Sequence, residues 1–99
     1  PAVAVKDTIK RACDGIVQQT LERSELFAVQ TPQVFQTDLI RAALTKAREE
    51  GAELPDDCSA VERLGIGVAL TQGDYCNLKI TTPEDLAAAE AYLAWRDSL

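Results

Sequence analysis

Lysine, arginine and hydroxyl side chains are the groups in this chain whose types and spacing suit chemistry on an anion. Lys79 alternates with Leu78 and Ile80, so it points away from their apolar side, just before a predicted helix N-terminus. Ligands of open α/β sheets bind at the carboxyl ends of strands, where a lysine can meet a phosphate as a compact point charge. A solvent-exposed lysine on a strand is the alternative.

A second cationic group is predicted near the N-terminus. Lys6, Thr8 and Lys10 share one face of a predicted strand, and Arg23 stands at the end of the segment that returns from it. These side chains could form a small anion-binding patch. Charges that protect an edge strand from aggregation are the alternative.

The residue inventory excludes several kinds of site. The chain has no histidine, which removes Ser-His and Cys-His nucleophilic catalysis within it. Cys13, Cys58 and Cys76 have no C-x-x-C spacing, so we expect free thiols in a reducing compartment rather than a zinc site or a disulfide framework. Helix capping explains Asp56-Asp57 without a metal, and Gly65-Ile-Gly67 is too short for a phosphate-binding loop. We therefore predict no metal site in these residues.

Length and charge limit the class of protein. The 99 residues allow one small domain, and the net charge of −6 argues against binding to nucleic acid or to an anionic membrane. No apolar run approaches the roughly 18 residues of a membrane span, so we expect a cytoplasmic protein. The chain opens inside an apolar, strand-like run without an initiator methionine, which we interpret as a piece of a longer protein.

Hydrophobic periodicity predicts a β-hairpin in the first quarter of the chain. Residues 3–9 alternate with period two, Asp14-Gly15 suits a type I′ turn, and residues 16–23 form a β-prone return segment. An isolated hairpin is marginal in water, so we expect it to lie against a missing half or another subunit.

Helices and short strands are predicted to follow. The first is a helix capped by Thr37 and closed by Gly51, and the second is a short helix opened by Asp56-Asp57. Strands are predicted near 68–70 and 76–80. The last helix has Thr82 as its cap, Pro83 as its first residue and Asp85 three residues after the cap. Strands alternating with helices over so short a length indicate an α/β sheet with helical cover.

Four segments together resemble the 2-C-methyl-D-erythritol 4-phosphate cytidylyltransferase family. They occur in the family's order and spacing and cover nearly the whole chain. The segments are Val5-Lys-Asp-Thr-Ile-Lys-Arg11, Thr20-Leu-Glu-Arg23 running on to Ala28-Val-Gln-Thr-Pro-Gln-Val-Phe35, Asp56-Asp-Cys-Ser-Ala-Val-Glu62, and Asn77-Leu-Lys-Ile-Thr-Thr-Pro-Glu-Asp85.

The resemblance implies an α/β fold, the C-terminal portion of a Rossmann-like (GT-A-like) nucleotidyltransferase sheet. Residues 1–99 would be part of one domain, with a protruding β-hairpin dimerisation arm at about 5–23 and the α/β remainder at about 24–99. The Gly-rich N-terminal half that binds CTP would be absent, or present as a complementary chain. The family forms homodimers through the arm, in the cytoplasm or, in plants and algae, in the plastid stroma.

The implied reaction is cytidylyl transfer from CTP to 2-C-methyl-D-erythritol 4-phosphate, with Mg²⁺, in non-mevalonate isoprenoid synthesis. Lys79 matches the family lysine that holds the substrate phosphate, and Arg23 matches an arginine that reaches the same phosphate from the neighbouring subunit. Thr8 and Thr31 match threonines that line the substrate site. Pro55 departs from the family, which often has a threonine there.

Two other functions stay open at this point. One is a related pentitol-phosphate cytidylyltransferase acting on ribitol 5-phosphate, because the phosphate-gripping residues would be much the same. The other is a catalytically silent fragment that only self-associates through its arm.

Overall fold

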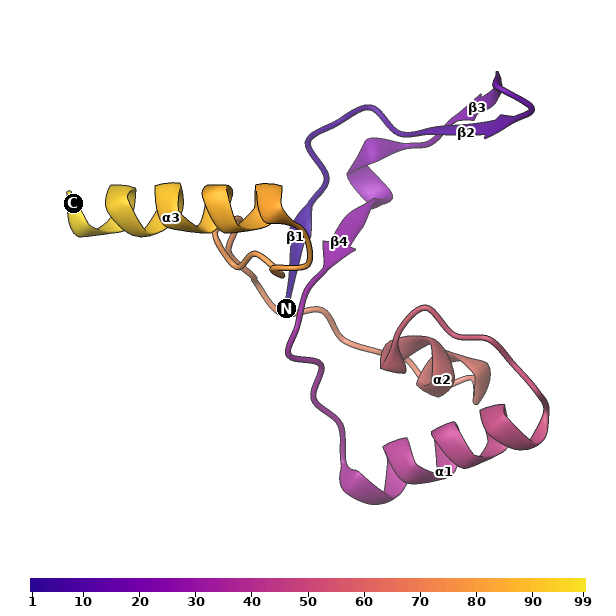
Figure 1. The fold of residues 1–99 in the computed structure, drawn as a ribbon. Coiled ribbons are helices and arrows are strands. Elements are labelled where there is room, and N and C mark those ends of the chain that lie inside the picture. The colour runs from indigo at the N-terminus through magenta and orange to yellow at the C-terminus, as the bar shows by residue number, and fades with distance from the viewer. The chain divides into compact units, whose positions relative to one another are not determined.

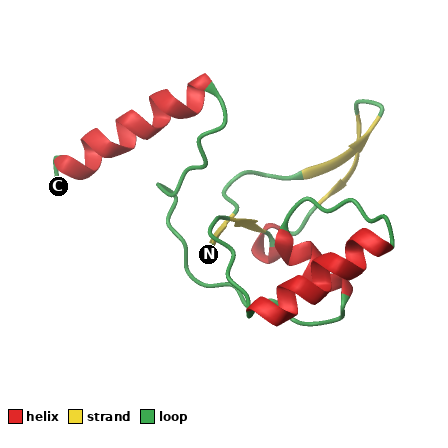
Figure 2. Ribbon diagram, turned by 60° about the horizontal axis from the view of Figure 1, so that its bottom comes forward, coloured by secondary structure: helices red, strands yellow, loops and turns green.

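The computed structural model describes all 99 residues and divides into two compact units. The first unit combines residues 1–31 with residues 71–99, and the second consists of residues 32–70. Figure 1 labels the elements along the chain, and Figure 2 separates helices from strands by colour. In chain order they are β1 (Ala2–Ala4), β2 (Lys10–Cys13), β3 (Ile16–Thr20), a 3₁₀ helix (Arg23–Glu25), β4 (Phe27–Val29), α1 (Thr37–Glu49), α2 (Asp57–Arg63) and α3 (Pro83–Asp97).

A hairpin with its turn at Asp14-Gly15 forms as predicted, but its strands are Lys10–Cys13 and Ile16–Thr20 and not residues 3–9 and 16–23. Strands β2 and β3 pair antiparallel, with Cys13 opposite Ile16 next to the turn. Asp14 and Gly15 have φ values of 50° and 76°, the two positive angles that a type I′ turn requires and that aspartate and glycine adopt most readily. Every residue of both strands is exposed, including Ile16 at 66%, so this unit offers the hairpin no apolar support.

The alternating run 3–9 does not form one strand, contrary to the prediction. Strand β1 ends at Ala4 and pairs antiparallel with β4, not with the hairpin. The hairpin ladder begins where Leu21 N–H donates to Ile9 O at 3.0 Å. Between the two ladders the returning chain coils into the 3₁₀ helix Arg23–Glu25, which interrupts strand pairing.

A segment from the C-terminal part of the chain joins β1. Ala2 forms an isolated parallel bridge with Gln72. Ala2 N–H donates to Thr71 O at 2.9 Å, and Gly73 N–H donates to Ala2 O, also at 2.9 Å. These backbone bonds fix residues 71–73 beside the first strand, about 70 positions away in sequence.

The strands predicted at 68–70 and 76–80 are wrong, because neither forms. Instead the chain turns, with Asn77 N–H donating to Asp74 O at 2.9 Å and Cys76 N–H donating to Asp74 Oδ1 at 2.7 Å. The turn satisfies the N–H groups of Cys76 and Asn77 locally, and the structure has no neighbouring strand with which the remaining residues could pair.

Helices α1 and α2 pack together in the second unit around small side chains. Ala43 of α1 is 1% exposed, and Ala60 and Val61 of α2 are 0% and 1% exposed. Burial of these apolar side chains is the main favourable term holding the pair. Partly buried neighbours complete the cluster, namely Phe35, Leu39, Ile40, Leu54, Leu64 and Val68.

The start of α1 differs by one residue from the prediction. Gln36 is the N-cap and Thr37 is already helical, because Ile40 N–H donates to Gln36 O at 3.0 Å. The predicted start of α2 is confirmed, since Asp56 Oδ1 accepts the backbone N–H of Ser59 at 2.9 Å.

Helix α3 has the predicted capping box. Asp85 N–H donates to Thr82 Oγ1 at 3.3 Å, and Thr82 N–H donates to Asp85 Oδ2 at 3.0 Å. Pro83 occupies the first helical turn, as expected. None of the side chains of α3 is buried. No helix in the structure is both long and apolar enough to span a bilayer.

Candidate functional site

Lys79 and Thr31 belong to one neighbourhood of the first unit. Lys79 is exposed and lies outside any strand, so the prediction of a strand-end lysine is corrected to a lysine on a loop. Asn77, two residues before it, donates through Nδ2 to Thr31 O at 2.8 Å. This bond joins the loop that carries Lys79 to the chain just after β4.

Arg23 and Thr8 belong to a second neighbourhood, at the base of the hairpin. Arg23 Nη1 donates to Lys6 O at 2.9 Å, which fixes its guanidinium beside the segment between β1 and β2. Thr8 lies two residues further along that segment, and both Arg23 and Thr8 are exposed. No hydrogen bond joins Arg23 or Thr8 to Lys79 or Thr31.

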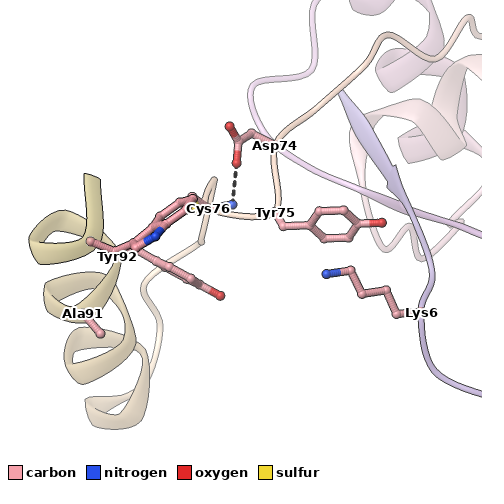
Figure 3. A pocket seen from close by; sticks show the side chains of 7 residues that line it. Lys6, Asp74, Tyr75, Cys76, Ala91 and Tyr92 are labelled. Carbon is pink, nitrogen blue, oxygen red and sulfur yellow. Dashed lines mark hydrogen bonds between the residues drawn. The ribbon is translucent and has the colours of Figure 1, made fainter. Parts of the chain in front are cut away.

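Tyr75 connects the two neighbourhoods. Lys6 Nζ lies 3.7 Å from the centroid of its ring, a cation–π contact that Figure 3 shows from close by. Tyr75 Oη also donates to Ala4 O at 2.7 Å, at the end of β1. The sequence pattern does not single out Tyr75, because its two partners lie about 70 residues earlier in the chain.

A cavity of about 560 Å³ opens beside this contact. Lys6 and Tyr75 lie on one side of it, and Tyr92 and Ala91 of α3 lie on the other (Figure 3). Its aromatic rings and its lysine ammonium are side-chain types that contact planar or anionic groups.

Gln30 is the second residue that sequence reasoning missed. Its side-chain Nε2 donates to Asp74 O at 2.8 Å and to Asn77 O at 3.3 Å, while Oε1 faces Asp74 N and Asn77 Nδ2 at 3.4 and 3.5 Å. Gln30 lies inside the segment Ala28–Phe35 that resembles the family, but the resemblance does not indicate what its side chain contacts.

Cys58 and Cys76 do not supply a nucleophile. Desolvation raises the pKa of the Cys76 thiol, and the Asp74 carboxylate raises it further. Desolvation and the charge of Asp56 raise the pKa of Cys58 in the second unit. All three cysteines are free thiols, and a high thiol pKa keeps Cys58 and Cys76 protonated near neutral pH. What this site can do is bind and orient an anion.

The residues do not fit a resident metal ion. Nowhere in the chain do three or more acidic, cysteine or histidine side chains cluster in a way that could hold one. Asp56 accepts hydrogen bonds from the Ser59 hydroxyl and N–H, and these bonds lower the pKa of Asp56. Its carboxylate therefore caps helix α2.

Solved structures of nucleotidyltransferases share this arrangement of elements. The crystal structure of 2-C-methyl-D-erythritol 4-phosphate cytidylyltransferase from Thermus thermophilus matches with a TM-score of 0.81 and 39% identity, over 95% of this chain and 46% of that one. A 4-diphosphocytidyl-2C-methyl-D-erythritol synthase from Anaerococcus prevotii matches with a TM-score of 0.81 and 36% identity, over 94% and 44%. The chain therefore has part of the Rossmann-like α/β fold of a nucleotidyltransferase, and the predicted fold class is confirmed.

Sequence comparison gives the family. Residues 1–95 match the 2-C-methyl-D-erythritol 4-phosphate cytidylyltransferase family. Curated relatives of that name include those of Geobacillus kaustophilus, 55% identical over 96 residues, and Desulforamulus reducens, 54% identical over 97 residues. Each match covers 97% of this chain and 42% of the relative, so the chain spans less than half the length of these relatives. The chain belongs to the 2-C-methyl-D-erythritol 4-phosphate cytidylyltransferase family.

Proposed function

We propose that these residues are part of an enzyme that transfers a cytidylyl group from CTP to 2-C-methyl-D-erythritol 4-phosphate. The products are 4-diphosphocytidyl-2-C-methyl-D-erythritol and pyrophosphate, in non-mevalonate isoprenoid synthesis. One observation carries the proposal. Lys79 is an exposed cation two residues after Asn77, whose side chain donates to Thr31 O, and the chain belongs to the cytidylyltransferase family.

In the proposed reaction, a phosphate oxygen of the alcohol phosphate attacks the α-phosphorus of CTP. A new P–O–P bond forms, and the bond between the α-phosphorus and the bridging oxygen of pyrophosphate breaks. Two phosphate groups must approach each other, so their like charges have to be offset while the attacking oxygen is aligned. The chain offers lysine and arginine for this work and no histidine, which agrees with catalysis by positioning and charge stabilisation.

Within that reaction we assign Lys79 and Arg23 to the phosphate of the alcohol substrate. Thr8 and Thr31, which belong to the same two neighbourhoods, would line the remainder of that substrate's site. Both cations are exposed, so their charges remain available to a ligand. The Arg23 guanidinium uses Nη1 for Lys6 O, which leaves its other N–H groups for a phosphate oxygen.

The hairpin supports a homodimer as part of the proposal. Its strands are exposed throughout, with Ile16 and Val17 at 66% and 55%, and an isolated two-stranded hairpin is marginal in water. A second subunit docked on this arm would bury these side chains. We propose that Arg23 then acts in the partner's site.

CTP and Mg²⁺ are assigned to the part of the enzyme beyond these 99 residues, whether on the same chain or on a complementary one. The relatives are more than twice as long as the matched segment, which leaves room for a triphosphate site. Since no acidic cluster in this chain fits a metal ion, the metal's ligands would be the triphosphate and groups outside these residues.

The test is pyrophosphate release by the enzyme that carries these residues together with the rest of its domain. It is measured with CTP and either 2-C-methyl-D-erythritol 4-phosphate or ribitol 5-phosphate, at matched concentrations. We expect the methylerythritol substrate to have the higher kcat/KM. A preference for ribitol 5-phosphate would transfer the assignment to a pentitol-phosphate cytidylyltransferase. Release with neither alcohol would refute the proposed function.

A further inference from the structure

The Gln30 carboxamide joins the end of β4 to the turn that precedes Lys79. Nε2 donates at 2.8 Å to Asp74 O and at 3.3 Å to Asn77 O, so one amide group contacts both ends of that turn. The Gln30 backbone is fixed as well, because its N–H donates to Pro1 O at 2.8 Å. The half-buried side chain of Gln30 thus contacts Asp74 and Asn77, which lie 44 and 47 positions further along the chain.

Asn77 extends this connection to Thr31. Its Nδ2 lies 3.5 Å from Gln30 Oε1 and donates to Thr31 O at 2.8 Å. The Gln30 carboxamide acts as donor and acceptor at once, and the Asn77 carboxamide donates to both Gln30 Oε1 and Thr31 O. Gln30 and Asn77 therefore form a continuous amide bridge from β4 to the loop.

No hydrogen bond holds Lys79 itself, so its position depends on the residues on either side of it. Its loop belongs to no strand, and residues 79 and 80 are exposed, with Ile80 at 52%. Backbone pairing with β1 ends at Gly73. On the N-terminal side of Lys79 the amide bridge is therefore the set of side-chain contacts that determines where the loop leaves the fold, while on the C-terminal side Thr81 is bonded to Asp85 of α3.

We propose that Gln30 is a positioning residue, which acts through Asn77 to fix Lys79 beside Thr31 for the phosphate of the alcohol substrate. The inference rests on the proposed function. Gln30 itself carries no charge and does not touch substrate in this assignment. Its effect arises because a shift of about 1 Å in a catalytic group can cost about 10²-fold in rate.

A double-mutant cycle on the enzyme that carries these residues tests the proposal. Gln30→Leu keeps the approximate side-chain volume and removes both the donor and the acceptor. We expect it to lower kcat/KM for the alcohol phosphate about 10-fold, with less than about a 2-fold change in KM for CTP. In a Lys79→Ala background we expect the same substitution to change kcat/KM less than about 2-fold, since the group it positions is gone.

Three controls separate positioning from loss of structure. Circular dichroism melts establish that each variant is folded at the assay temperature. If Gln30→Leu does not fold, Gln30→Glu replaces it, because it keeps the side-chain shape and loses the donor while adding one negative charge. Gln36→Leu makes the same chemical change at an exposed residue with no side-chain cap bond, and is expected to leave kcat/KM unchanged.

The outcomes distinguish the inference from the proposed function. If Lys79→Ala lowers kcat/KM but Gln30→Leu has its full effect in both backgrounds, Gln30 does not act through Lys79 and the inference is overturned. An equal rise in both KM values would overturn it too, as the sign of general structural damage. If Lys79→Ala changes nothing, the assignment of Lys79 in the proposed function fails, and the inference fails with it.

Discussion

Gly73→Ala is the substitution whose consequence the structure defines most sharply. A Cβ at Gly73 would collide with Gln30 Oε1 and would lie 3.1 Å from Ala2 O. Ala2 O is a backbone atom that accepts the Gly73 N–H at 2.9 Å, so it cannot move without breaking the bridge to β1. The Gln30 side chain must therefore leave its position. It would lose its hydrogen bonds to Asp74 O and Asn77 O, each worth about 1 kcal/mol net.

We therefore expect Gly73→Ala to lower the free energy of unfolding by about 2 kcal/mol, measured by urea denaturation of the enzyme that carries these residues. Gly67→Ala is the matched control, since nothing lies within 4 Å of a Cβ there and its φ is not in the left-handed region. It is expected to be neutral or stabilising by up to about 1 kcal/mol. Equal stability of the two variants would refute the close approach of Gly73 to Gln30. In a Gln30→Ala background Gly73→Ala should cost much less than about 2 kcal/mol, because the collision partner and its two hydrogen bonds are already absent.

Two further predictions concern the capping box of α3, and a third concerns the isolated chain. Thr82→Ala is expected to cost about 1 kcal/mol at the start of α3, seen as faster hydrogen exchange of its first-turn amides; unchanged exchange would contradict the capping box. Hydrogen bonds from the Thr81 N–H and hydroxyl lower the pKa of Asp85, whose carboxylate also accepts the Thr82 N–H. The Thr81 and Thr82 amides should therefore keep their protection above about pH 4 and lose it as the pH falls through the lowered value. Protection that does not change with pH in this range would contradict the role of the Asp85 carboxylate. The 99-residue chain alone is expected not to turn over CTP in a pyrophosphate-release assay, because its sequence contains no Gly-rich phosphate loop; turnover would refute this.

Local signals predicted the turns and most helix ends correctly. Asp14-Gly15 and the Thr82 capping box depend on the conformational preferences of a few adjacent residues, and the structure has both. Asp56 at the start of α2 is a third case. Each of these features would form with the same residues in many folds, so a single sequence is enough to find it.

Long-range pairing could not be predicted from the same patterns. The run 3–9 alternates like one strand, but it divides because the opposing chain coils into a 3₁₀ helix. The alternation at 76–80 likewise predicts a strand, but the turn at Asp74 and the Gln30 amide satisfy the backbone instead. The partners lie 23 to 27 positions away for β1 and 44 positions away for Asp74, and periodicity does not register such separations.

The candidate site shows the same division. The family resemblance pointed to Lys79, Arg23, Thr8 and Thr31 as site residues. In the structure these residues lie in two neighbourhoods linked by Tyr75. Gln30 and Asn77 lie inside segments that resemble the family, but the resemblance gives their side chains no role, and Tyr75 lies outside those segments.

The measurement that most directly tests the central claim is the activity of mixed variants. Lys79→Ala and Arg23→Ala subunits, each expected to lose about 10²-fold in kcat/KM, are refolded together so that heterodimers form. If Lys79 acts in its own subunit and Arg23 in its partner's, one site of each heterodimer carries both lesions and the other carries neither. Random mixing should then restore about a quarter of the activity of the unmodified enzyme. Heterodimers that form, as shown by native mass spectrometry, and remain as inactive as either parent would contradict a phosphate site shared between two subunits.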